Sequence, residues 1–443
     1  MAFSKDDWID IHRKSRWHNS LQISLISEFL GISSKDILSS VKEYNSEYYK
    51  NLIAVVFEDF LNTYNYKIEK YIGIAENDYY ALKKQDIEIS PGKFKRCITE
   101  GYMFITHKDY KFILEFDTLY GHDKWGMNLF YAYKDEEKTL SFLTNLEKYA
   151  EDNNYLKNAK ISPNLSHIDI KNKYSWDDIV LPSKLVKEIK TNVDNLFNNI
   201  DKYKSIGVKF KRGIILQGVP GTGKTMIGKI LCHTAKCSFI WVTPRFLSRS
   251  DDVAQVCKLA RVLSPTILFL EDIDLYGGSR NVSDNRGILG ELMNQLDGLI
   301  ENEYVVVIAT TNNVEHVEKA LRNRPGRFDR IIEIPKPRSK ERRKLLELFT
   351  KNYDVSNVDF DNIIQNSKGF TGAHMQELVT AAVIEAIDSG SKSGKKLILT
   401  NEHFGENFDK IKDKDIKPVG FTTPRDYDED DDDDDPIGSN TSI

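Results

Sequence analysis

Eight residues between two apolar segments carry the clearest chemistry of the chain. They run from Gly218 to Thr225, read GVPGTGKT and fit the pattern G-x-x-x-x-G-K-[S/T]. Glycines in such a loop let backbone N–H groups approach an anion closely at the start of a helix, where the helix dipole favours negative charge. The lysine supplies a positive charge for phosphate oxygens, and the threonine supplies a hydroxyl for Mg²⁺. The loop predicts binding of a nucleoside triphosphate with Mg²⁺.

The competing interpretation is a glycine-rich turn that holds no ligand. Phosphate binding is favoured because the loop stands between a β-like segment and an amphipathic helix, and because an acidic strand end, Glu271 and Asp272, follows. Lys224 is suited to the β- and γ-phosphates, and Thr225 to the metal. The residues expected to hold the nucleotide here are Gly218, Val219, Pro220, Gly221, Thr222, Gly223, Lys224, Thr225 and Met226.

The elements around this loop have the pattern of a parallel sheet buried on both faces. Five apolar segments are short, and each is separated from the next by enough residues for a crossover connection. A helix is expected before them, from Ser183 to Tyr203, and another after the loop, from Met226 to Ala235. The predicted strands are Gly213–Leu216, Ser238–Val242, Thr266–Leu270, Tyr304–Ala309 and Ile331–Ile334.

The sequence beyond Pro335 is largely helical. Helices are expected at Ser339–Asn352, Asp361–Asn366 and Gly372–Ser389. These segments predict a small helical domain that packs against the sheet. The fold class is therefore α/β for the loop-bearing part, with a helical domain after it.

The region from Met1 to about Ser166 contains no motif. Ile37–Tyr71 has apolar residues at mixed spacings of three and four, which predicts helix, whereas Ile87–Tyr133 alternates and contains turn signals, which predicts a β-meander. The many Tyr and Phe residues fit either a docking surface or the region's own core. The core interpretation is favoured, because aromatic side chains usually bury themselves.

Charge and composition exclude several classes of protein. Residues 428–435 contribute −8 to a formal net charge of −5, so the rest of the chain carries +3 and offers no argument for nucleic acid. This acidic block is expected to be disordered, as a solubilising tail rather than an arm for a basic partner. The four cysteines lack metal-type spacing, and neither a signal peptide nor an apolar run of membrane length is present. We expect a cytoplasmic protein without a membrane partner.

Three further motifs follow the loop in a fixed order. They are the acidic pair Glu271 and Asp272, the segment Val306–Asn313, and the segment Arg324–Arg330, which reads RPGRFDR. With them, about Tyr174–Lys392 resembles the classical AAA ATPases. The resemblance implies a P-loop AAA core with a helical lid, ATP hydrolysis with Mg²⁺, and assembly into a ring that we expect to be hexameric.

The resemblance also sets the expected domains. They are an N-terminal α+β recruitment domain at 1–166, a large α/β ATPase subdomain at 167–335, a small helical lid at 336–415 and a disordered acidic tail at 416–443.

By this resemblance, the acidic pair divides the work at the phosphates. Glu271 would help to hold Mg²⁺ through water, and Asp272 would polarise the attacking water. Asn312 is similar to the sensor residue that orients this water. Asp178 and Ile179 match the segment that contacts adenine, while Gly372 and Ala373 match the lid turn on the nucleotide's other side.

Arg327 and Arg330 resemble the arginine fingers that reach the nucleotide of a neighbouring subunit. An arginine supplied in trans contributes about 10³- to 10⁵-fold to the rate, so hydrolysis would depend on assembly. The alternative is a surface salt bridge, which the adjacent Pro-Gly and the order of motifs disfavour.

Two departures from the family pattern affect the expected activity. The usual acidic pair is Asp then Glu, and the reversed order here moves each carboxylate by one methylene, so we expect slow but real hydrolysis. The loop between Pro244 and Asp252 is short, and Phe246 is its one aromatic candidate for gripping a polypeptide. Phe246 packing under the loop is the alternative. A second pore loop is expected at Leu275–Arg280.

Three functions remain open at this point. The leading hypothesis is a ring ATPase that remodels or unfolds a protein client recruited by the N-terminal region. The alternative is an ATP-gated switch or scaffold that regulates a separate effector, such as a partner protease or nuclease. Nucleic-acid translocation rests on a basic segment that is better explained as a solvated helix face, comprising Lys336, Arg338, Lys340, Arg342, Arg343 and Lys344.

Overall fold

The computed structural model describes most of the chain as two compact units. The first reaches to Lys336 and the second begins at Pro337. The acidic tail predicted at 416–443 lies outside the described residues. These are residues 20–44, 46–76, 79–119, 124–169, 172–208, 210–275, 282–297, 303–312, 328, 330–390, 392–393, 396–405 and 407–414.

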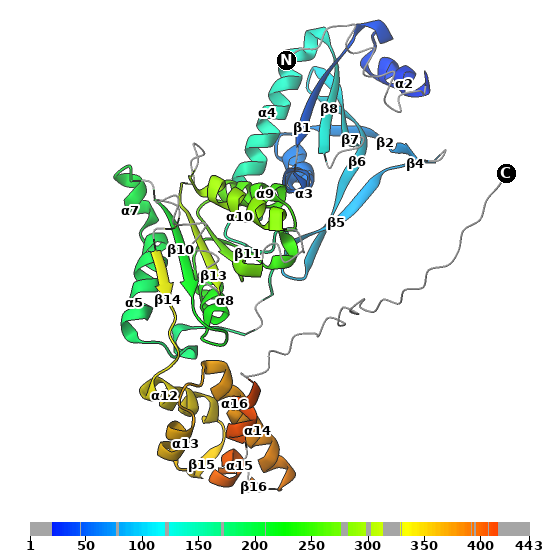
Figure 1. The fold of residues 1–443 in the computed structure, drawn as a ribbon. Coiled ribbons are helices and arrows are strands. Elements are labelled where there is room, and N and C mark those ends of the chain that lie inside the picture. Colours follow the sequence, from blue (N-terminus) through cyan, green and yellow to red (C-terminus); the bar gives the residue numbers. More distant parts are fainter. Residues whose placement is uncertain are drawn as a thin grey trace, which may run out of the picture. The chain divides into compact units, whose positions relative to one another are not determined.

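An antiparallel sheet of six strands forms the N-terminal layer of the first unit (Figure 1). Its order is β1-β8-β7-β6-β2, and β5 pairs with β6. Helices α3 (Glu47–Thr63) and α4 (Glu136–Asp152) pack on one face, and α2 (Ser20–Leu30) packs on the other. The strands are β1 (Ile37–Tyr44), β2 (Lys67–Ile72), β5 (Lys83–Ser90), β6 (Lys93–His107), β7 (Tyr110–Leu119) and β8 (Lys124–Ala132), with a small hairpin of β3 (Ile74–Glu76) and β4 (Tyr79–Ala81).

Many of the aromatic rings of this layer form its own core. The centroids of Phe57 and Phe116 are 5.0 Å apart, and those of Phe112 and Phe142 are 4.7 Å apart. These four rings are almost fully buried. The core interpretation is confirmed for them, since rings packed at these distances stabilise the sheet against its helices.

The helix predicted for Ile37–Tyr71 is wrong at both ends. Residues 37–44 form strand β1, residues 47–63 form helix α3, and residues 67–72 form strand β2. In β1 the apolar residues Ile37, Val41 and Tyr44 fall at helix-like spacing by coincidence. Pairing with β8 over the whole length of β1 decides its conformation, because tertiary context overrides a weak local pattern.

A carboxyl group, Glu115, is buried in the middle of this sheet. It lies between Tyr102 of β6 and Asn128 of β8, which are its register partners, and the Asn128 side chain donates to its Oε2 at 2.7 Å. Burial away from water, followed by the nearby Asp117, raises the pKa of Glu115 to about 8, and hydrogen bonds from Tyr102 and Asn128 oppose this rise. Glu115 therefore keeps its proton at neutral pH.

We expect Glu115→Gln to raise the free energy of unfolding at pH 7 by about 3 kcal/mol, since each pKa unit corresponds to about 1.4 kcal/mol. Below about pH 4 both folded and unfolded wild-type chains are protonated at this carboxyl, so the two proteins should be equally stable. As the pH rises towards 8, the unfolded chain ionises first and the wild type loses stability. Urea unfolding at several pH values measures this slope, with the exposed Glu137→Gln as control. Parallel curves for wild type and Glu115→Gln would contradict it.

The second layer is a parallel sheet whose order is β14-β10-β13-β12-β11-β9. Five of its strands are those predicted, within two residues at each end. Apolar side chains of β10, such as Ile214 and Ile215, enter different cores on the two faces, so the sheet is buried on both sides as expected. The strands are β10 (Lys211–Gln217), β11 (Ser238–Val242), β12 (Thr266–Leu270), β13 (Val305–Thr311) and β14 (Arg330–Glu333), and the crossover helices are α8 (Lys224–Thr234), α9 (Ser250–Val262) and α10 (Val282–Asp297).

A sixth strand, β9 (Lys160–Ile161), was not predicted. It pairs in parallel with Phe239 and Ile240 of β11, so the prediction of five strands is one too few. The Lys160 ammonium donates to the carbonyl oxygens of Ala235 at 2.7 Å and Cys237 at 2.5 Å, just after helix α8 ends. A strand of two residues has no pattern in the sequence, but this one ties the segment after α4 to the phosphate-loop helix.

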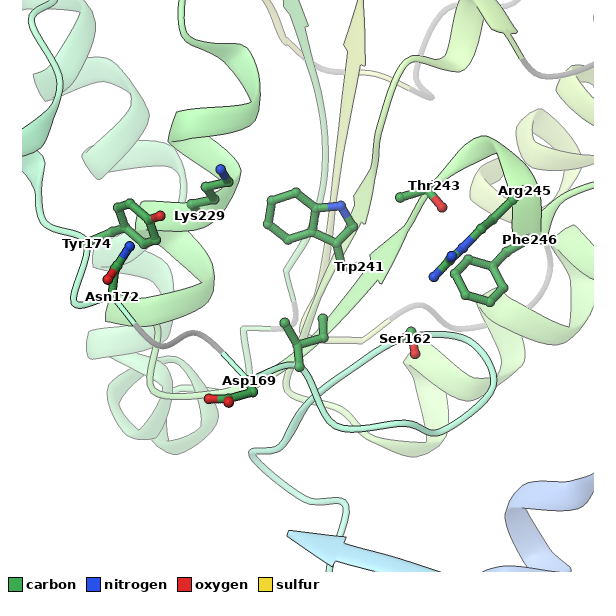
Figure 2. Close-up of a pocket in the computed structure, with 10 residues that line it drawn as sticks. Ser162, Asp169, Asn172, Tyr174, Lys229, Trp241, Thr243, Arg245 and Phe246 are labelled. Atoms are coloured by element: carbon green, nitrogen blue, oxygen red, sulfur yellow. The ribbon is translucent and has the colours of Figure 1, made fainter. Parts of the chain in front are cut away.

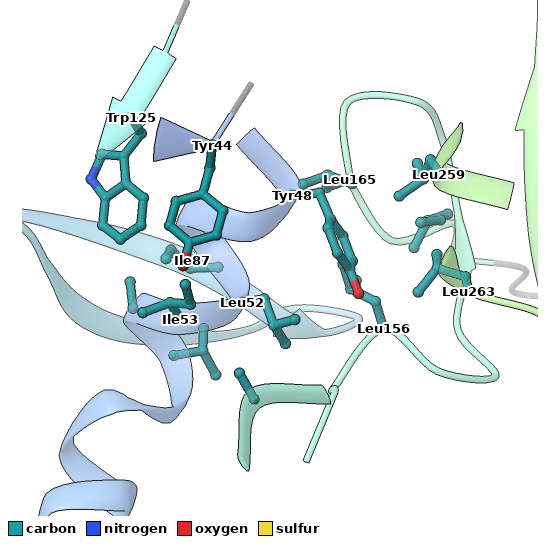
Figure 3. Close-up of a cluster of buried hydrophobic side chains, with 14 of the residues drawn as sticks. Tyr44, Tyr48, Leu52, Ile53, Ile87, Trp125, Leu156, Leu165, Leu259 and Leu263 are labelled. Carbon is teal, nitrogen blue, oxygen red and sulfur yellow. The ribbon is translucent and has the colours of Figure 1, made fainter. Parts of the chain in front are cut away.

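The two layers of the first unit share one apolar core. Tyr48 and Leu52 of α3, Leu156 and Leu165 of the connecting segment, and Leu259 and Leu263 at the end of α9 belong to one buried cluster (Figure 3). The backbone N–H of His167 also donates to Glu88 Oε2 at 3.0 Å, which fastens the connecting segment to β5.

The single helix predicted for Ser183–Tyr203 is wrong as one element. It is divided into α5 (Ser183–Asn192), α6 (Asp194–Asn198) and α7 (Ile200–Ser205). The break at Val193 has φ −124° and ψ −74°, outside the helical region. Its side chain is buried in the core, so packing of this β-branched residue prevails over helix continuity.

The second unit contains the three predicted helices and a small sheet that was not predicted. Buried Leu346, Met375, Leu378 and Phe404 lie at the centre of its elements. The sheet has the order β15-β17-β16. The helices are α12 (Ser339–Thr350), α13 (Phe360–Asn366), α14 (Gly372–Asp388), α15 (Asn401–Gly405) and α16 (Asn407–Lys414), and the strands are β15 (Asp354–Asn357), β16 (Lys392–Ser393) and β17 (Lys396–Thr400).

Candidate nucleotide site

The loop after β10 has the geometry of an anion cradle. Gly223 has φ +105°, a conformation that side chains disfavour, and it leads directly into helix α8 at Lys224. A Cβ on Gly218 would stand 2.4 Å from the Ile334 carbonyl oxygen, so this position excludes any side chain. Backbone N–H groups at the start of α8 are thereby left open to an anion.

The Lys224 ammonium is held over the loop by three acceptors. It donates to the carbonyl oxygens of Gly218 at 2.7 Å and Val219 at 3.1 Å, and to Asn312 Oδ1 at 2.8 Å. Desolvation lowers the pKa of Lys224, while Asp272 and Asp274 oppose this effect. The hydrogen bond to Asn312 places the predicted sensor residue, which follows β13, directly beside the predicted phosphate-binding lysine.

The first residue of the acidic pair is held through both carboxylate oxygens. Glu271 Oε1 accepts from the Thr225 hydroxyl at 2.7 Å, and Oε2 accepts from Trp241 Nε1 at 3.1 Å. The backbone N–H of Glu271 donates to the Val242 carbonyl at 2.8 Å, which fixes where the chain leaves β12. A hydroxyl and a carboxylate oxygen in contact form a donor set that Mg²⁺ favours, so these residues fit the metal.

The second residue of the pair has an unusual backbone. Asp272 has φ +48°, which is uncommon for a residue other than glycine and is often found at functional sites. Thr310 supports this conformation, because its hydroxyl accepts from the Asp272 N–H at 2.8 Å. Asn312 Nδ2 lies 3.5 Å from Asp272 Oδ1. Desolvation, then Glu271 and Asp274, raise the pKa of Asp272.

Three residues of this arrangement were missed by the sequence interpretation. Trp241 and Thr310 contact the acidic pair, and Asp274 Oδ1 accepts from the Asn312 N–H at 3.2 Å. Trp241 and Thr310 each stand one residue from the carboxyl end of a predicted strand, and Asp274 stands four residues beyond the end of another. In a parallel sheet those ends meet at one edge, and this could have identified them.

Among the residues matched to the adenine and lid segments, Ile179 lies close to the phosphate loop, whereas Gly372 and Ala373 lie in the second unit. Ile179 lies against the phosphate loop, since its Cδ1 would be 3.1 Å from a Cβ on Gly223. The Asp178 carboxylate accepts from Ser175 N at 2.7 Å in a capping box, and the Asp178 backbone N–H donates to the Ser175 carbonyl oxygen at 3.1 Å. Gly372 and Ala373 begin helix α14 in the second unit. Their role at the nucleotide stays a prediction.

Of the two predicted arginine fingers, Arg330 lies within the described residues. Arg327 lies outside the described residues. Arg330 is exposed at the first position of β14 and is in register with Ile214 of β10. Parallel strands run the same way, so Arg330 stands three positions before Gln217, after which its own phosphate loop begins.

In the loop expected to grip a polypeptide, the aromatic residue and its neighbour Leu247 pack against the core. Phe246 ends a short helix, Pro244–Phe246, is half-buried against the core, and has the Arg245 guanidinium 4.7 Å from its ring centre. Leu247 is buried. The structure therefore supports the alternative in which Phe246 packs under the loop. In the second predicted pore loop, Leu275 is exposed and Tyr276–Arg280 lie outside the described residues.

The basic segment crosses the boundary between the two units, and part of it is engaged within the protein. Arg342 is buried and donates to the Pro337 and Ile364 carbonyl oxygens, and Arg343 pairs with Asp361. Two of its six cations thus have structural partners, which further weakens the nucleic-acid interpretation. Across the described ranges, no helix has the length and apolar character needed to cross a membrane.

Comparison with known proteins places the match on these same elements. Residues 214–336 match the sequence model of the ATPase family associated with various cellular activities (AAA). Over 236 residues, 50% of this chain and 35% of the relative, the sequence is 35% identical to the ATP-dependent zinc metalloprotease FtsH of Mycoplasmopsis synoviae. Over 229 residues, 49% of this chain and 55% of the relative, it is 31% identical to proteasome-activating nucleotidase 2 of Haloferax volcanii.

A third relative, protein CdcH of Halobacterium salinarum, is 30% identical over 228 residues, 48% of this chain and 30% of the relative. The chain thus spans between 30% and 55% of the length of these three relatives. Each alignment covers about half of this chain, and the family match begins in β10, directly before the phosphate loop. From the loop, the acidic strand end and the asparagine gathered at one edge of the sheet, together with these likenesses, we conclude that residues 214–336 belong to an AAA ATPase domain.

Proposed function

We propose that the chain hydrolyses ATP with Mg²⁺ as a ring, expected to be hexameric, and that the ring remodels or unfolds a protein client. The observation that carries the hydrolytic part is the contact of Lys224 with Asn312, which in turn lies beside Asp272. One lysine, one amide and one carboxylate are thus grouped where the γ-phosphate of a nucleotide on this loop would lie.

The side chains of the site have separable tasks in this proposal. Lys224 would turn its donors from the loop carbonyls and Asn312 towards phosphate oxygens. Thr225 and Glu271 would hold Mg²⁺, which supplies positive charge against the β- and γ-phosphates. Asp272 would accept a hydrogen bond from the attacking water, in a position fixed by Thr310 and Asn312.

In this proposal hydrolysis depends on assembly because Arg330 would act on the nucleotide of a neighbouring chain. Since Arg330 stands at the opposite end of β14 from its own phosphate loop, it is better placed to serve a neighbouring chain than its own. A ring in which each chain lends an arginine to the next closes by head-to-tail contacts. Arg327 is proposed for the same task by resemblance.

A protein client is proposed from the relatives and from the N-terminal layer. The names of two relatives refer to a protease and to the proteasome, which supports a polypeptide substrate. The N-terminal sheet shares a core with the ATPase layer. A client bound to the N-terminal sheet would therefore be connected directly to the nucleotide domain. That contact makes this region the proposed recruitment surface.

The proposed activity is tested by ATP turnover over a range of protein concentrations. Turnover per chain should rise steeply as chains assemble, and Lys224→Ala should abolish both nucleotide binding and turnover, because the lysine supplies the main positive charge for the phosphates. Light scattering on the same samples follows assembly. A protein that remains monomeric at micromolar concentration with MgATP and shows no turnover would exclude the proposal.

One observation favours a second candidate, an ATP-gated switch that regulates a separate effector. Phe246, the aromatic residue expected to grip a polypeptide, is half-buried against the core. A ring without a free aromatic at this loop would use the ATP state to hold a partner rather than to thread a chain. Phe246→Ala separates the two, since only a threading ring should lose client processing while keeping its ATP turnover.

A further inference from the structure

Trp241 contacts the first residue of the acidic pair, and the sequence motifs assign it no role. It lies in β11, in register with Phe269 of β12, and the two ring centroids are 4.8 Å apart. Its indole Nε1 donates to Glu271 Oε2 at 3.1 Å, while Thr225 donates to Oε1 at 2.7 Å. Each oxygen of Glu271 therefore has its own protein donor.

The reversed order of the acidic pair explains why Glu271 needs a second hydrogen bond. Glutamate is one methylene longer than aspartate and has one more rotatable bond, so a single hydrogen bond to Thr225 would leave its carboxylate free to turn. An indole N–H is a donor only, on a rigid ring with two rotatable bonds, and Phe269 packs against that ring. The second hydrogen bond therefore fixes the plane of the longer acid.

We propose that Trp241 is a positioning residue that adapts this site to glutamate at position 271 and so sets the affinity for Mg²⁺. The inference rests on the proposed function, because it concerns the metal that accompanies ATP. Partners of metal-binding groups typically change metal affinity by about 10- to 100-fold when they are removed.

Trp241 also lines a surface cavity of about 460 Å³ (Figure 2). Lys229, Thr243 and Phe246 also line this cavity, and Figure 2 shows the indole between them. The indole is partly buried and is held in place by the Phe239 and Phe269 rings and by Glu271 rather than by full enclosure. Its orientation should depend on the hydrogen bond to Glu271.

The test is ATP binding measured by calorimetry in the full chain, at Mg²⁺ concentrations from zero to saturation. Trp241→Phe keeps a smaller aromatic ring beside Phe269 and removes the indole N–H. We expect the Mg²⁺ concentration for half-maximal tight binding to rise about 10-fold or more, with the affinity for ATP without Mg²⁺ unchanged. Trp125→Phe, which removes an indole N–H bonded to the Thr99 carbonyl in the N-terminal layer, should leave both values unchanged.

A second pair of variants distinguishes loss of the hydrogen bond from a general disruption of the site. In a Glu271→Asp background the shorter acid does not reach the indole. Adding Trp241→Phe to this background should therefore change the Mg²⁺ requirement less than threefold. A double-mutant cycle measures this difference between the two backgrounds. Equal Mg²⁺ requirements for wild type and Trp241→Phe, or equal effects of Trp241→Phe in both backgrounds, would overturn the inference alone. Wild-type chain that binds no ATP at saturating Mg²⁺ would overturn the proposed function and the inference with it.

Discussion

Replacing Asp272 with asparagine is expected to lower ATP turnover by about 10²- to 10⁴-fold, the range for loss of a positioned general base. Affinity for MgATP should change little, because the contacts of Lys224 and Thr225 with Gly218, Asn312 and Glu271 do not involve this carboxylate. The Asp272 backbone N–H would still donate to Thr310, so the strained φ should persist. Single-turnover hydrolysis and calorimetry on the same preparation measure the two quantities separately.

The control for this result is Glu271→Gln, in which the binding of MgATP, rather than the hydrolytic step alone, should be affected. Nucleotide binding by Glu271→Gln should require more Mg²⁺, because the substitution removes the negative charge of the side chain that contacts Thr225 at the proposed metal site. Turnover in Asp272→Asn within threefold of wild type would show that Asp272 does not act on water.

The same variant distinguishes the two candidate functions. A remodelling ring that cannot hydrolyse ATP should retain its client and lose its activity. A switch should instead engage its effector permanently, because the ATP state persists. Affinity capture with Asp272→Asn in the presence of ATP therefore identifies the partner in either case.

Replacing Arg330 with alanine is the second large expected effect. An arginine finger contributes about 10³- to 10⁵-fold to turnover, and we expect a loss towards the lower end because Arg327 is proposed to share the task. ATP binding to isolated chains should be unaffected, since Arg330 stands level with Ile214, three positions before β10 ends. Arg96→Ala, which breaks the exposed pair with Asp86, is the matched control and should keep wild-type turnover. Equal turnover in Arg330→Ala and Arg96→Ala would contradict the role.

Much of the fold and site could be predicted because local signals and tertiary structure agree there. The strands predicted at Ser238–Val242 and Thr266–Leu270 have the same bounds as β11 and β12, since continuous apolar segments between turn signals have few other uses. The glycines, Lys224 and Thr225 were identifiable because phosphate chemistry fixes their spacing within one loop.

The remainder depended on contacts between residues far apart in the sequence. Strand β9 has two residues and exists because β11 offers an edge, and β1 was taken for helix because its pairing with β8 is invisible locally. Trp241 reaches Glu271 only because neighbouring parallel strands end together. No spacing rule links two residues on adjacent strands, so such positioning residues escape motif analysis.

Mixing two inactive variants tests most directly whether neighbouring chains build each nucleotide pocket together. A chain with Asp272→Asn retains Arg330, and a chain with Arg330→Ala retains Asp272. If the arginine acts in trans and the chains mix at random in a ring, about a quarter of the pockets regain both groups. We therefore predict that an equal mixture recovers about a quarter of wild-type turnover, although each variant alone is nearly inactive. Turnover of the mixture no higher than the mean of the two separate variants would contradict the shared pocket.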